Sequence, residues 1–436
     1  MASYRVRMAV FAGGERLPLL LGPDGGPHFE STLFVVTELR MKNLAANTIA
    51  NALRALQLFV TFLESEGIDL RKRLSDGLVL KLYEVEALAQ ACRRPLEALS
   101  AVAEVAPAAA SRRAQNMRLE RFRSRLSGSV EDAVNPAVTA TRLQCIRDYV
   151  GWMAEIHLAQ QAATPQSRGE LRAAVDAFRH ALDARMPSGG ASQEREGVPP
   201  EIRSRLLEVT RPDAPQNPWV DDFARCRNAL IVDWLYYLGL RRGELLSLRV
   251  SDIDFRRCVV HVFRRPDALD DPRRSQPVVK TRARELPLSQ VLLDATRNYI
   301  VELRSSRPQA RKHEFLFVAA SGAPLSMPAF AKVFTVLRSK IPDLPDDLTP
   351  HTLRHTWNDR FSEEMDHNKV SEDTERKARS YLMGWSETSG TAVVYTRRHV
   401  REKAKQVSLD LQESMRGGKC DEQRLGAFGP RNGAES

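Results

Sequence analysis

The feature that most constrains the fold of this chain is residues 186–200, a segment rich in Gly, Ser, Pro and charged residues. The segment has no apolar periodicity, and a stretch of this composition is typical of a linker. The chain has 436 residues, which is more than one hydrophobic core usually serves. We therefore predict two domains, residues 29–185 and residues 201–416, on either side of this linker.

The two ends of the chain differ from these domains in composition. Residues 1–28 begin with a short alternation of apolar and polar residues and continue with Gly and Pro, which predicts an N-terminal arm or an edge strand. Residues 417–436 are Gly-rich and polar, which predicts a disordered tail. Just before this tail, Val407, Leu411 and Met415 repeat every four residues and indicate a helix.

Residues 29–185 follow a helical pattern. Asn47 is a suitable N-cap, and Leu53 and Leu56 follow it at helical spacing. A second long helix is predicted over residues 138–156. Between the two helices, six arginines crowd one helical stretch, namely Arg112, Arg113, Arg118, Arg121, Arg123 and Arg125. Such a row either contacts phosphates or forms a solvated face, and the sequence leaves both interpretations open.

Strand signals are confined to a short part of the second domain. The runs 258–263, 277–280 and 284–288 predict a small antiparallel sheet. Residues 265–276 hold two prolines and three aspartates, which predicts a loop. Helical patterns flank this region on both sides. The predicted fold class is therefore mainly α with a small antiparallel β-sheet.

Charge and cysteine usage restrict the class of partner. The net charge of +10 favours a polyanionic partner, because lysines and arginines that neutralise phosphates release counterions. The five cysteines are scattered and form no Cys-x-x-Cys pair, so we expect neither a disulfide framework nor a zinc site. We expect a cytoplasmic protein, associated with a bacterial nucleoid and without a membrane span, since residues 1–28 lack a signal-peptide pattern and the apolar run 229–240 is too short to cross a bilayer.

The run Gly-Leu-Arg-Arg-Gly-Glu-Leu at residues 239–245 predicts a corner between two helices. Gly239 is expected to end the first helix, and one of the two adjacent arginines, Arg241 or Arg242, would project from the corner into a cleft. Glu244 is positioned to orient an arginine. A plain corner with a surface arginine is the alternative interpretation of this run when it is taken alone.

A second motif lies at the predicted start of a helix near residue 350. Thr349 is a suitable N-cap, Pro350 suits the first helical position, and His351 and Arg354 then face the same direction. The N-terminal end of such a helix presents amide donors and a positive dipole, which suits a phosphate.

The order Arg241, Lys280, His351, Arg354, Trp385 and Tyr395 resembles the tyrosine recombinase, or phage integrase, family. The family pattern is Arg…Lys…His-x-x-Arg…His/Trp…Tyr. The resemblance is strong over roughly the C-terminal half of the chain and loose before it. It implies a helical, SAM-like DNA-binding domain followed by an α+β catalytic domain. Tyr395 lies ten residues after Trp385, about one more than is usual in the family, which predicts a small insertion near Gly390.

The resemblance implies a role for each matched residue. The catalytic set would be Tyr395 as nucleophile, Arg241 and Arg354 as clamps on the scissile phosphate, His351 as base, Lys280 as acid and Trp385 as support of the transition state. Glu244 and His355 would support these residues. Lys280, Arg282 and Arg284 also have a simpler interpretation, in which they only contact the DNA backbone.

The resemblance implies a site-specific recombinase that cleaves and rejoins DNA through a 3′-phosphotyrosyl intermediate. Its expected partners are double-stranded recombination sites, a tetramer of the chain on two sites, and accessory DNA-bending or partner recombinase proteins. The helix over residues 407–415 would dock on a neighbouring protomer or pack on its own domain. No cofactor or metal is expected, because fixed positive charge replaces the metal. The alternatives are a type IB topoisomerase and a non-catalytic DNA-binding protein.

Overall fold

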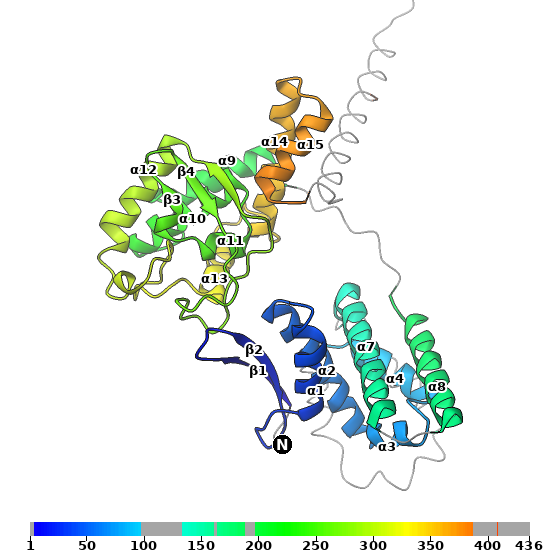
Figure 1. Ribbon diagram of the computed structural model, residues 1–436. Coiled ribbons are helices and arrows are strands. Elements are labelled where there is room, and N and C mark those ends of the chain that lie inside the picture. Colours follow the sequence, from blue (N-terminus) through cyan, green and yellow to red (C-terminus); the bar gives the residue numbers. More distant parts are fainter. Residues whose placement is uncertain (1–3, 97–132, 161–163, 188–196, 387–407, 409–436) are drawn as a thin grey trace, which may run out of the picture. The chain divides into compact units, whose positions relative to one another are not determined.

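The computed structural model of the chain describes residues 4–96, 133–160, 164–187, 197–386 and residue 408 (Figure 1). The chain divides into two compact units. Unit 1 comprises Met1–Glu194 and Pro266–Gln276, and unit 2 comprises Arg195–Arg265 and Pro277–Ser436. The first division falls at Glu194, inside the range expected for a linker. The assignment of Pro266–Gln276 to unit 1 was not expected from the sequence.

Unit 1 combines a β-hairpin with a set of helices. The hairpin pairs β1 (Arg5–Val10) with β2 (Arg16–Leu21) in antiparallel register, with Val10 opposite Arg16. The helical elements are α1 (Phe29–Phe34) with a π-helical continuation (Val35–Arg40), α2 (Ala46–Ser65), α3 (Leu70–Ser75), α4 (Leu82–Cys92), α7 (Pro136–Gln160) and α8 (Pro165–Asp183). The N-terminal residues thus form a hairpin, more than the arm or single edge strand that the sequence predicted.

The core of unit 1 lies where α2 packs against α7 and the hairpin. Leu53 and Phe59 of α2 and Leu143 and Ile146 of α7 are completely buried. The prediction that Asn47 is the N-cap is wrong, because α2 begins at Ala46 with Ala45 as its N-cap. The second predicted helix is confirmed as α7 and extends beyond residues 138–156 at both ends.

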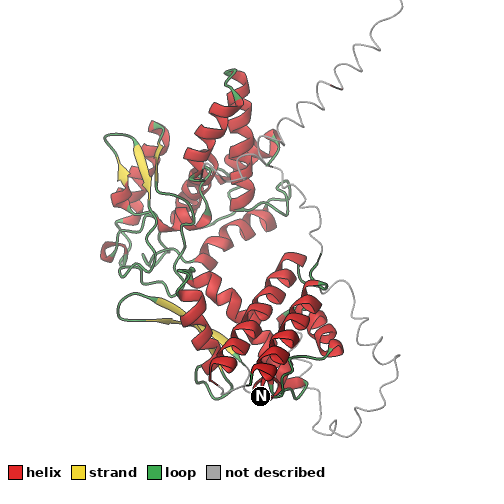
Figure 2. Cartoon of the chain, turned by 45° about the vertical axis from the view of Figure 1, so that its right-hand side comes forward, coloured by secondary structure: helices red, strands yellow, loops and turns green. Residues whose placement is uncertain are grey.

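Unit 2 is mostly helical and contains one small sheet. Its elements are α9 (Pro200–Thr210), α10 (Asp222–Leu238), α11 (Arg242–Ser247), a 3-10 turn (Val250–Asp252), β3 (Ile253–Asp254), β4 (Val259–Val262), β5 (Arg284–Pro287), α12 (Gln290–Asn298), a π-helical continuation (Tyr299–Arg304), a 3-10 turn (Ala310–Lys312), α13 (Met327–Lys340), α14 (Pro350–His367) and α15 (Glu372–Met383). In the described residues of both units helices dominate and strands are few (Figure 2), which confirms the predicted fold class. Over the same residues no helix is both long and apolar enough to cross a bilayer.

The sheet of unit 2 differs in one strand from the prediction. Its antiparallel order is β3-β4-β5, so two of the predicted strands are confirmed as β4 and β5. Residues 277–280 form no strand, and β3 takes the third place instead. Pro277 has no amide hydrogen, and its carbonyl accepts a hydrogen bond from the Ser247 hydroxyl at 3.1 Å. This segment is therefore bonded to α11 and not to a neighbouring strand.

Helix α10 provides the central support of unit 2. Its residues Ile231, Trp234 and Leu235 are completely buried, and the Trp234 indole nitrogen donates to the Thr296 hydroxyl at 3.0 Å. Helix α14 packs against α10. Helix α10 ends and α14 begins at the site described next, so these two packed helices fix the position of its side chains.

Candidate active site

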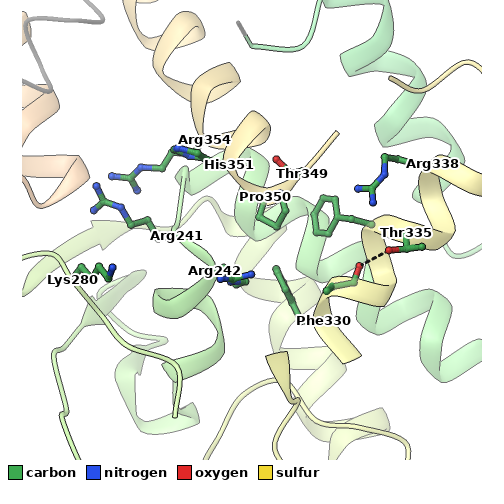
Figure 3. Close-up of a pocket in the computed structure, with 12 residues that line it drawn as sticks. Arg241, Arg242, Lys280, Phe330, Thr335, Arg338, Thr349, Pro350, His351 and Arg354 are labelled. Atoms are coloured by element: carbon green, nitrogen blue, oxygen red, sulfur yellow. Dashed lines mark hydrogen bonds between the residues drawn. The ribbon is translucent and has the colours of Figure 1, made fainter. Parts of the chain in front are cut away.

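A cavity of about 580 Å³ in unit 2 collects the charged residues that the sequence singled out. Its lining consists of Arg241, Arg242, Lys280, Phe330, Ala331, Phe334, Thr335, Arg338, Thr349, Pro350, His351 and Arg354. Arg241, Lys280, His351 and Arg354 gather on one side, while Arg338 of α13 lies on the other (Figure 3). No carboxylate is among these lining residues, so the cavity favours an anion.

Helix α14 places His351 and Arg354 at this cavity. Thr349 is its N-cap and accepts a hydrogen bond from the Thr352 amide at 3.2 Å, and Pro350 occupies the first helical position, so the predicted start is confirmed. His351 is exposed, whereas Arg354 is only 1% exposed. The centroids of the His351 and His355 rings lie 4.4 Å apart and their planes are tilted by 42°, so His355 contacts His351 from the next turn of the helix.

The corner between α10 and α11 places Arg241. Gly239 ends α10 with φ of 60°, as predicted, and a Cβ there would lie 2.8 Å from the Trp357 ring. The carbonyl of Gly239 accepts a hydrogen bond from Arg354 Nη1 at 2.6 Å. Arg241 follows as the N-cap of α11, with its side chain 34% exposed. At this corner the Gly239 carbonyl thus holds the Arg354 side chain, while the Arg241 side chain stays partly exposed to solvent.

Glu244 is the buried carboxylate that organises these cations. Its oxygens lie 3.8 Å from Arg354 Nη1 and 3.9 Å from Arg241 Nη1, and it accepts from the Arg241 amide at 2.9 Å. The Thr281 hydroxyl donates to it at 2.5 Å and Arg284 Nη2 at 2.9 Å. Burial raises the pKa of the Glu244 carboxyl, but the charges of Arg284 and Arg354 outweigh this effect and hold the pKa below its usual value. Glu244 therefore stays ionised.

Arg284 corrects one prediction. Its side chain is 1% exposed, and it donates to Glu244 and to the Leu382 carbonyl at 2.6 Å. It was expected to contact DNA, but in this position it cannot reach a polyanion at the surface. Its burial could not be predicted from the sequence, because arginine side chains are mostly exposed and Lys280 and Arg282 lie close by in the chain.

Lys280 is exposed and lies on a firmly held segment. The carbonyl of Pro277 is bonded to Ser247, and Val279 is 4% exposed. On the other side, the Arg282 amide donates to the Gly384 carbonyl at 3.0 Å. Arg282 itself is exposed.

Trp385 lies beside Arg354. Its ring centre is 5.5 Å from the Arg354 guanidinium carbon, a distance at which a cation and an indole attract one another. Trp385 is 8% exposed and packs with Met383 and Trp357. The carbonyl of Met383 accepts from Arg354 Nη2 at 3.0 Å. The carbonyls of Gly239 and Met383 therefore bind one terminal nitrogen each of the Arg354 guanidinium.

Several predicted residues lie outside the described residues. Tyr395, the six arginines between residues 112 and 125, and the apolar stripe over 407–415 belong to this group. Conversely, sequence reasoning missed Arg338, whose Nη1 donates to the Leu348 carbonyl at 2.7 Å. Nothing in the sequence distinguished this arginine from others in the last turn of a helix. Among the described residues, no group of three or more His, Cys, Asp or Glu could hold a metal ion.

Comparisons with known proteins concern mainly the C-terminal half of the chain. The phage integrase family model matches residues 213–402. A tyrosine recombinase XerD of Halalkalibacterium halodurans is 26% identical over 204 residues, which cover 46% of this chain and 63% of that protein. A tyrosine recombinase of Pseudothermotoga lettingae is 27% identical over 218 residues, which cover 49% of this chain and 64% of that protein. The matched part thus spans less than two thirds of either relative.

A solved structure is also similar. The XerH site-specific recombinase bound to its difH substrate aligns with a TM-score of 0.36 and 14% identity, over 80% of this chain and 95% of that one. The matched range 213–402 contains Arg241, Glu244, Lys280, His351 and Arg354, the same residues that unit 2 brings to the cavity or directly behind it. Residues 213–402 of this chain thus match the phage integrase family model, and this part of the chain is similar to tyrosine recombinases.

Proposed function

We propose that this protein is a site-specific DNA recombinase that cleaves and rejoins DNA strands through a 3′-phosphotyrosyl intermediate at Tyr395. The observation that carries the proposal is the cavity with Arg241, Lys280, His351 and Arg354 in its lining and no carboxylate. A site of this charge binds the anionic phosphodiester and stabilises the extra negative charge of its transition state. The named relatives, which are tyrosine recombinases, favour this function over a topoisomerase or a non-catalytic DNA-binding protein.

Cleavage is a transesterification. The Tyr395 hydroxyl oxygen attacks the scissile phosphorus and His351 accepts its proton, while the bond from phosphorus to the 5′ oxygen breaks. Lys280 gives a proton to that leaving oxygen, and the 3′ end remains attached to the tyrosine. Attack by a 5′-hydroxyl reverses these steps and rejoins the strand, so the number of phosphodiester bonds is conserved without an energy source.

The two arginines contribute differently to this step. The guanidinium of Arg354 is bonded to the carbonyls of Gly239 and Met383, so it is already oriented before the phosphate arrives. Arg241 is partly exposed and can move toward a non-bridging oxygen. Trp385 packs against Arg354 and keeps water from that side. Fixed charges of this kind need little reorganisation during the reaction.

The partners follow from the reaction. The substrate would be a pair of double-stranded recombination sites held by four protomers, with accessory DNA-bending proteins or a partner recombinase as further components. The exposed Arg282 and the arginines between residues 112 and 125 are candidates for backbone contacts. The protein would act in the cytoplasm, where the chromosome is accessible.

Covalent capture on a nicked suicide substrate tests the proposal. Tyr395→Phe should abolish the detergent-resistant protein–DNA adduct while DNA binding stays nearly unchanged, because only the hydroxyl is lost. An adduct formed by the phenylalanine variant would show that another residue is the nucleophile. Relaxation of supercoiled plasmids that lack paired sites would instead favour the topoisomerase alternative.

A further inference from the structure

Lys280 is an exposed residue between two buried neighbours in unit 2. Val279 is 4% exposed and Thr281 is 6% exposed, whereas Lys280 lines the cavity on the same side as Arg241 (Figure 3). A lysine side chain is a long, flexible stem, so its amine is placed only as well as the backbone that carries it. The contacts of the buried neighbours therefore decide where the amine can donate a proton.

The hydroxyl of Thr281 lies between two buried ions. It accepts a hydrogen bond from Arg284 Nη1 at 3.1 Å and lies 2.5 Å from Glu244 Oε1. Arginine only donates and an ionised carboxylate only accepts, so the hydrogen of the hydroxyl points to Glu244. The hydroxyl thus bridges a cation and an anion, which an apolar side chain of the same shape could not do.

The backbone around Thr281 packs against the end of α15. The Arg282 amide donates to the Gly384 carbonyl at 3.0 Å. Gly384 has φ of 64°, and a Cβ there would lie 2.9 Å from Thr281 Cβ and 3.0 Å from the Arg282 carbonyl oxygen. This close approach leaves Thr281 little room to shift against α15.

Glu244 is also the carboxylate behind the two arginines of the proposed phosphate clamp. It accepts from the Arg241 amide at 2.9 Å, and its oxygen lies 3.8 Å from Arg354 Nη1. Neighbouring Cα atoms are about 3.8 Å apart, so a fixed Thr281 also fixes the point where the Lys280 side chain begins. Through the Thr281 hydroxyl, one buried carboxylate therefore sets the positions of all three cations.

We propose that Thr281 is a positioning residue for Lys280. Its hydroxyl couples the backbone of the proposed general acid to Glu244. Proton donation to the leaving 5′ oxygen is thereby aligned with the phosphate that Arg241 and Arg354 hold. Thr281 is buried and is not among the residues that line the cavity, so it acts only through Lys280. This inference rests on the proposed function, in which Lys280 is the acid.

The leaving group provides a readout that a merely structural role would not change. Cleavage is measured on two nicked suicide substrates that differ only in the bridging 5′ atom, which is oxygen in one and sulfur in the other. A thiolate leaves without a proton, so loss of the acid slows only the oxygen substrate. Lys280→Ala is expected to be about 100-fold slower on oxygen and within about threefold of the unchanged protein on sulfur.

Thr281→Val removes the hydroxyl, keeps the shape of the side chain and should show the same selectivity. We expect a loss of about 10- to 100-fold on oxygen, since small displacements of a catalytic group cost rates of this size. Cleavage of the sulfur substrate should stay within about threefold of the unchanged protein. Thr281→Ser keeps the hydroxyl, so its rate on oxygen should also stay within about threefold.

Thr296→Val is the matched control. Thr296 is a completely buried threonine of α12, and its hydroxyl accepts from the Trp234 indole nitrogen at 3.0 Å and donates to the Leu292 carbonyl at 2.7 Å. These partners belong to α10 and α12, so the variant removes a buried hydroxyl from unit 2 without releasing the segment that carries Lys280. The ratio of its rates on the two substrates should equal that of the unchanged protein.

The ratio also guards against misfolding, because an inactive fraction lowers both rates equally. Thr281→Ala likewise lacks the hydroxyl and places no methyl group against the carboxylate, so it replaces Thr281→Val if that variant is poorly expressed. Equal losses on both substrates, or no loss on either, in the variants without the hydroxyl would overturn this inference alone if Lys280→Ala remains selective. Equal losses in Lys280→Ala would overturn the acid assignment and this inference with it. An unchanged protein that forms no adduct with either substrate would refute the proposed function and, with it, the role of Thr281.

Discussion

Glu244→Gln is expected to destabilise unit 2 far more than the loss of one charge at the surface would. The substitution keeps the shape of the side chain and removes its charge. Glu244 lies between two guanidiniums that are themselves almost completely buried, those of Arg284 and Arg354. After the change, both positive charges remain in the interior without the carboxylate.

The magnitude follows from this geometry. Removing one partner of a buried ion pair costs about 3–5 kcal/mol, because the remaining charge is left uncompensated. Glu244→Gln should lie in this range. Arg284→Met should cost less, because Glu244 keeps Thr281, the Arg241 amide and Arg354 as partners. The double variant should cost less than the two single changes together, by about 0.5–3 kcal/mol.

Urea unfolding followed by tryptophan fluorescence is the suitable assay. Four of the five tryptophans, Trp219, Trp234, Trp357 and Trp385, belong to unit 2, so the signal reports mainly on this unit. The transitions of the two units must be fitted separately, since a chain with two units need not unfold in one step. Asp373→Asn, which breaks an exposed ion pair with Lys377 on α15, is the matched control and should leave the transition midpoint unchanged.

The pH dependence gives a second check with a defined sign. The pKa of Glu244 is lower in the folded protein than its usual value of 4.5. The stabilisation by the ionised Glu244 is therefore fully present above pH 4.5 and is lost as the pH falls through the lower pKa of the folded protein. The difference in stability between the unchanged protein and Glu244→Gln should be constant from about pH 6 to 8 and shrink only in acid. Two results would refute this account of the cluster. One is a difference in unfolding free energy between the unchanged protein and Glu244→Gln below about 1 kcal/mol at pH 7, and the other is a double variant whose loss equals the sum of the two single losses.

Three further predictions concern the same unit. Burial raises the pKa of Asp233 in α10 from 3.8 to about 6, so its ionisation should destabilise the fold as the pH rises through this window, by on the order of 2 kcal/mol. Asp233→Asn should remove this pH dependence from urea midpoints taken between pH 4 and 7.5, and identical slopes for the two proteins would contradict it. Arg241→Ala and Arg354→Ala should each slow cleavage by about 100-fold or more, whereas Arg242→Ala should have a much smaller effect. A larger loss at Arg242 in single-turnover cleavage would shift the assignment by one residue. Cleavage should proceed in excess EDTA, because cations and no carboxylate line the cavity, and a strict need for magnesium would reject the proposed mechanism.

Local signals in the sequence predicted several parts of the site. Thr349 and Pro350 mark the start of α14 because an N-cap and a first-turn proline act within one turn of the helix. Gly239 marks the end of α10 because few other residues adopt a positive φ. From these positions the shared face of His351 and Arg354 follows directly.

Features that depend on distant parts of the chain could not be predicted in this way. Arg284 is buried only because Glu244 and the Leu382 carbonyl receive its donors, and neither partner is adjacent in sequence. Arg338 reaches the cavity through the packing of α13. The assignment of Pro266–Gln276 to unit 1 depends on Arg16, about 250 residues away, and composition identified that stretch only as a loop.

The burial of Glu244 explains how a buried arginine and a partly exposed one can be attached to the same carboxylate. A carboxylate without partners would be protonated or excluded at this depth, and buried guanidiniums without it would be equally unfavourable. Together they form a rigid base in which Arg354 is held by two carbonyls and Arg284 connects β5 to the end of α15. Arg241 is attached to the same carboxylate by its amide and keeps an accessible side chain. In the proposed mechanism, the buried cluster would fix the donors before DNA binds, which is the condition under which electrostatic stabilisation of a transition state is most effective.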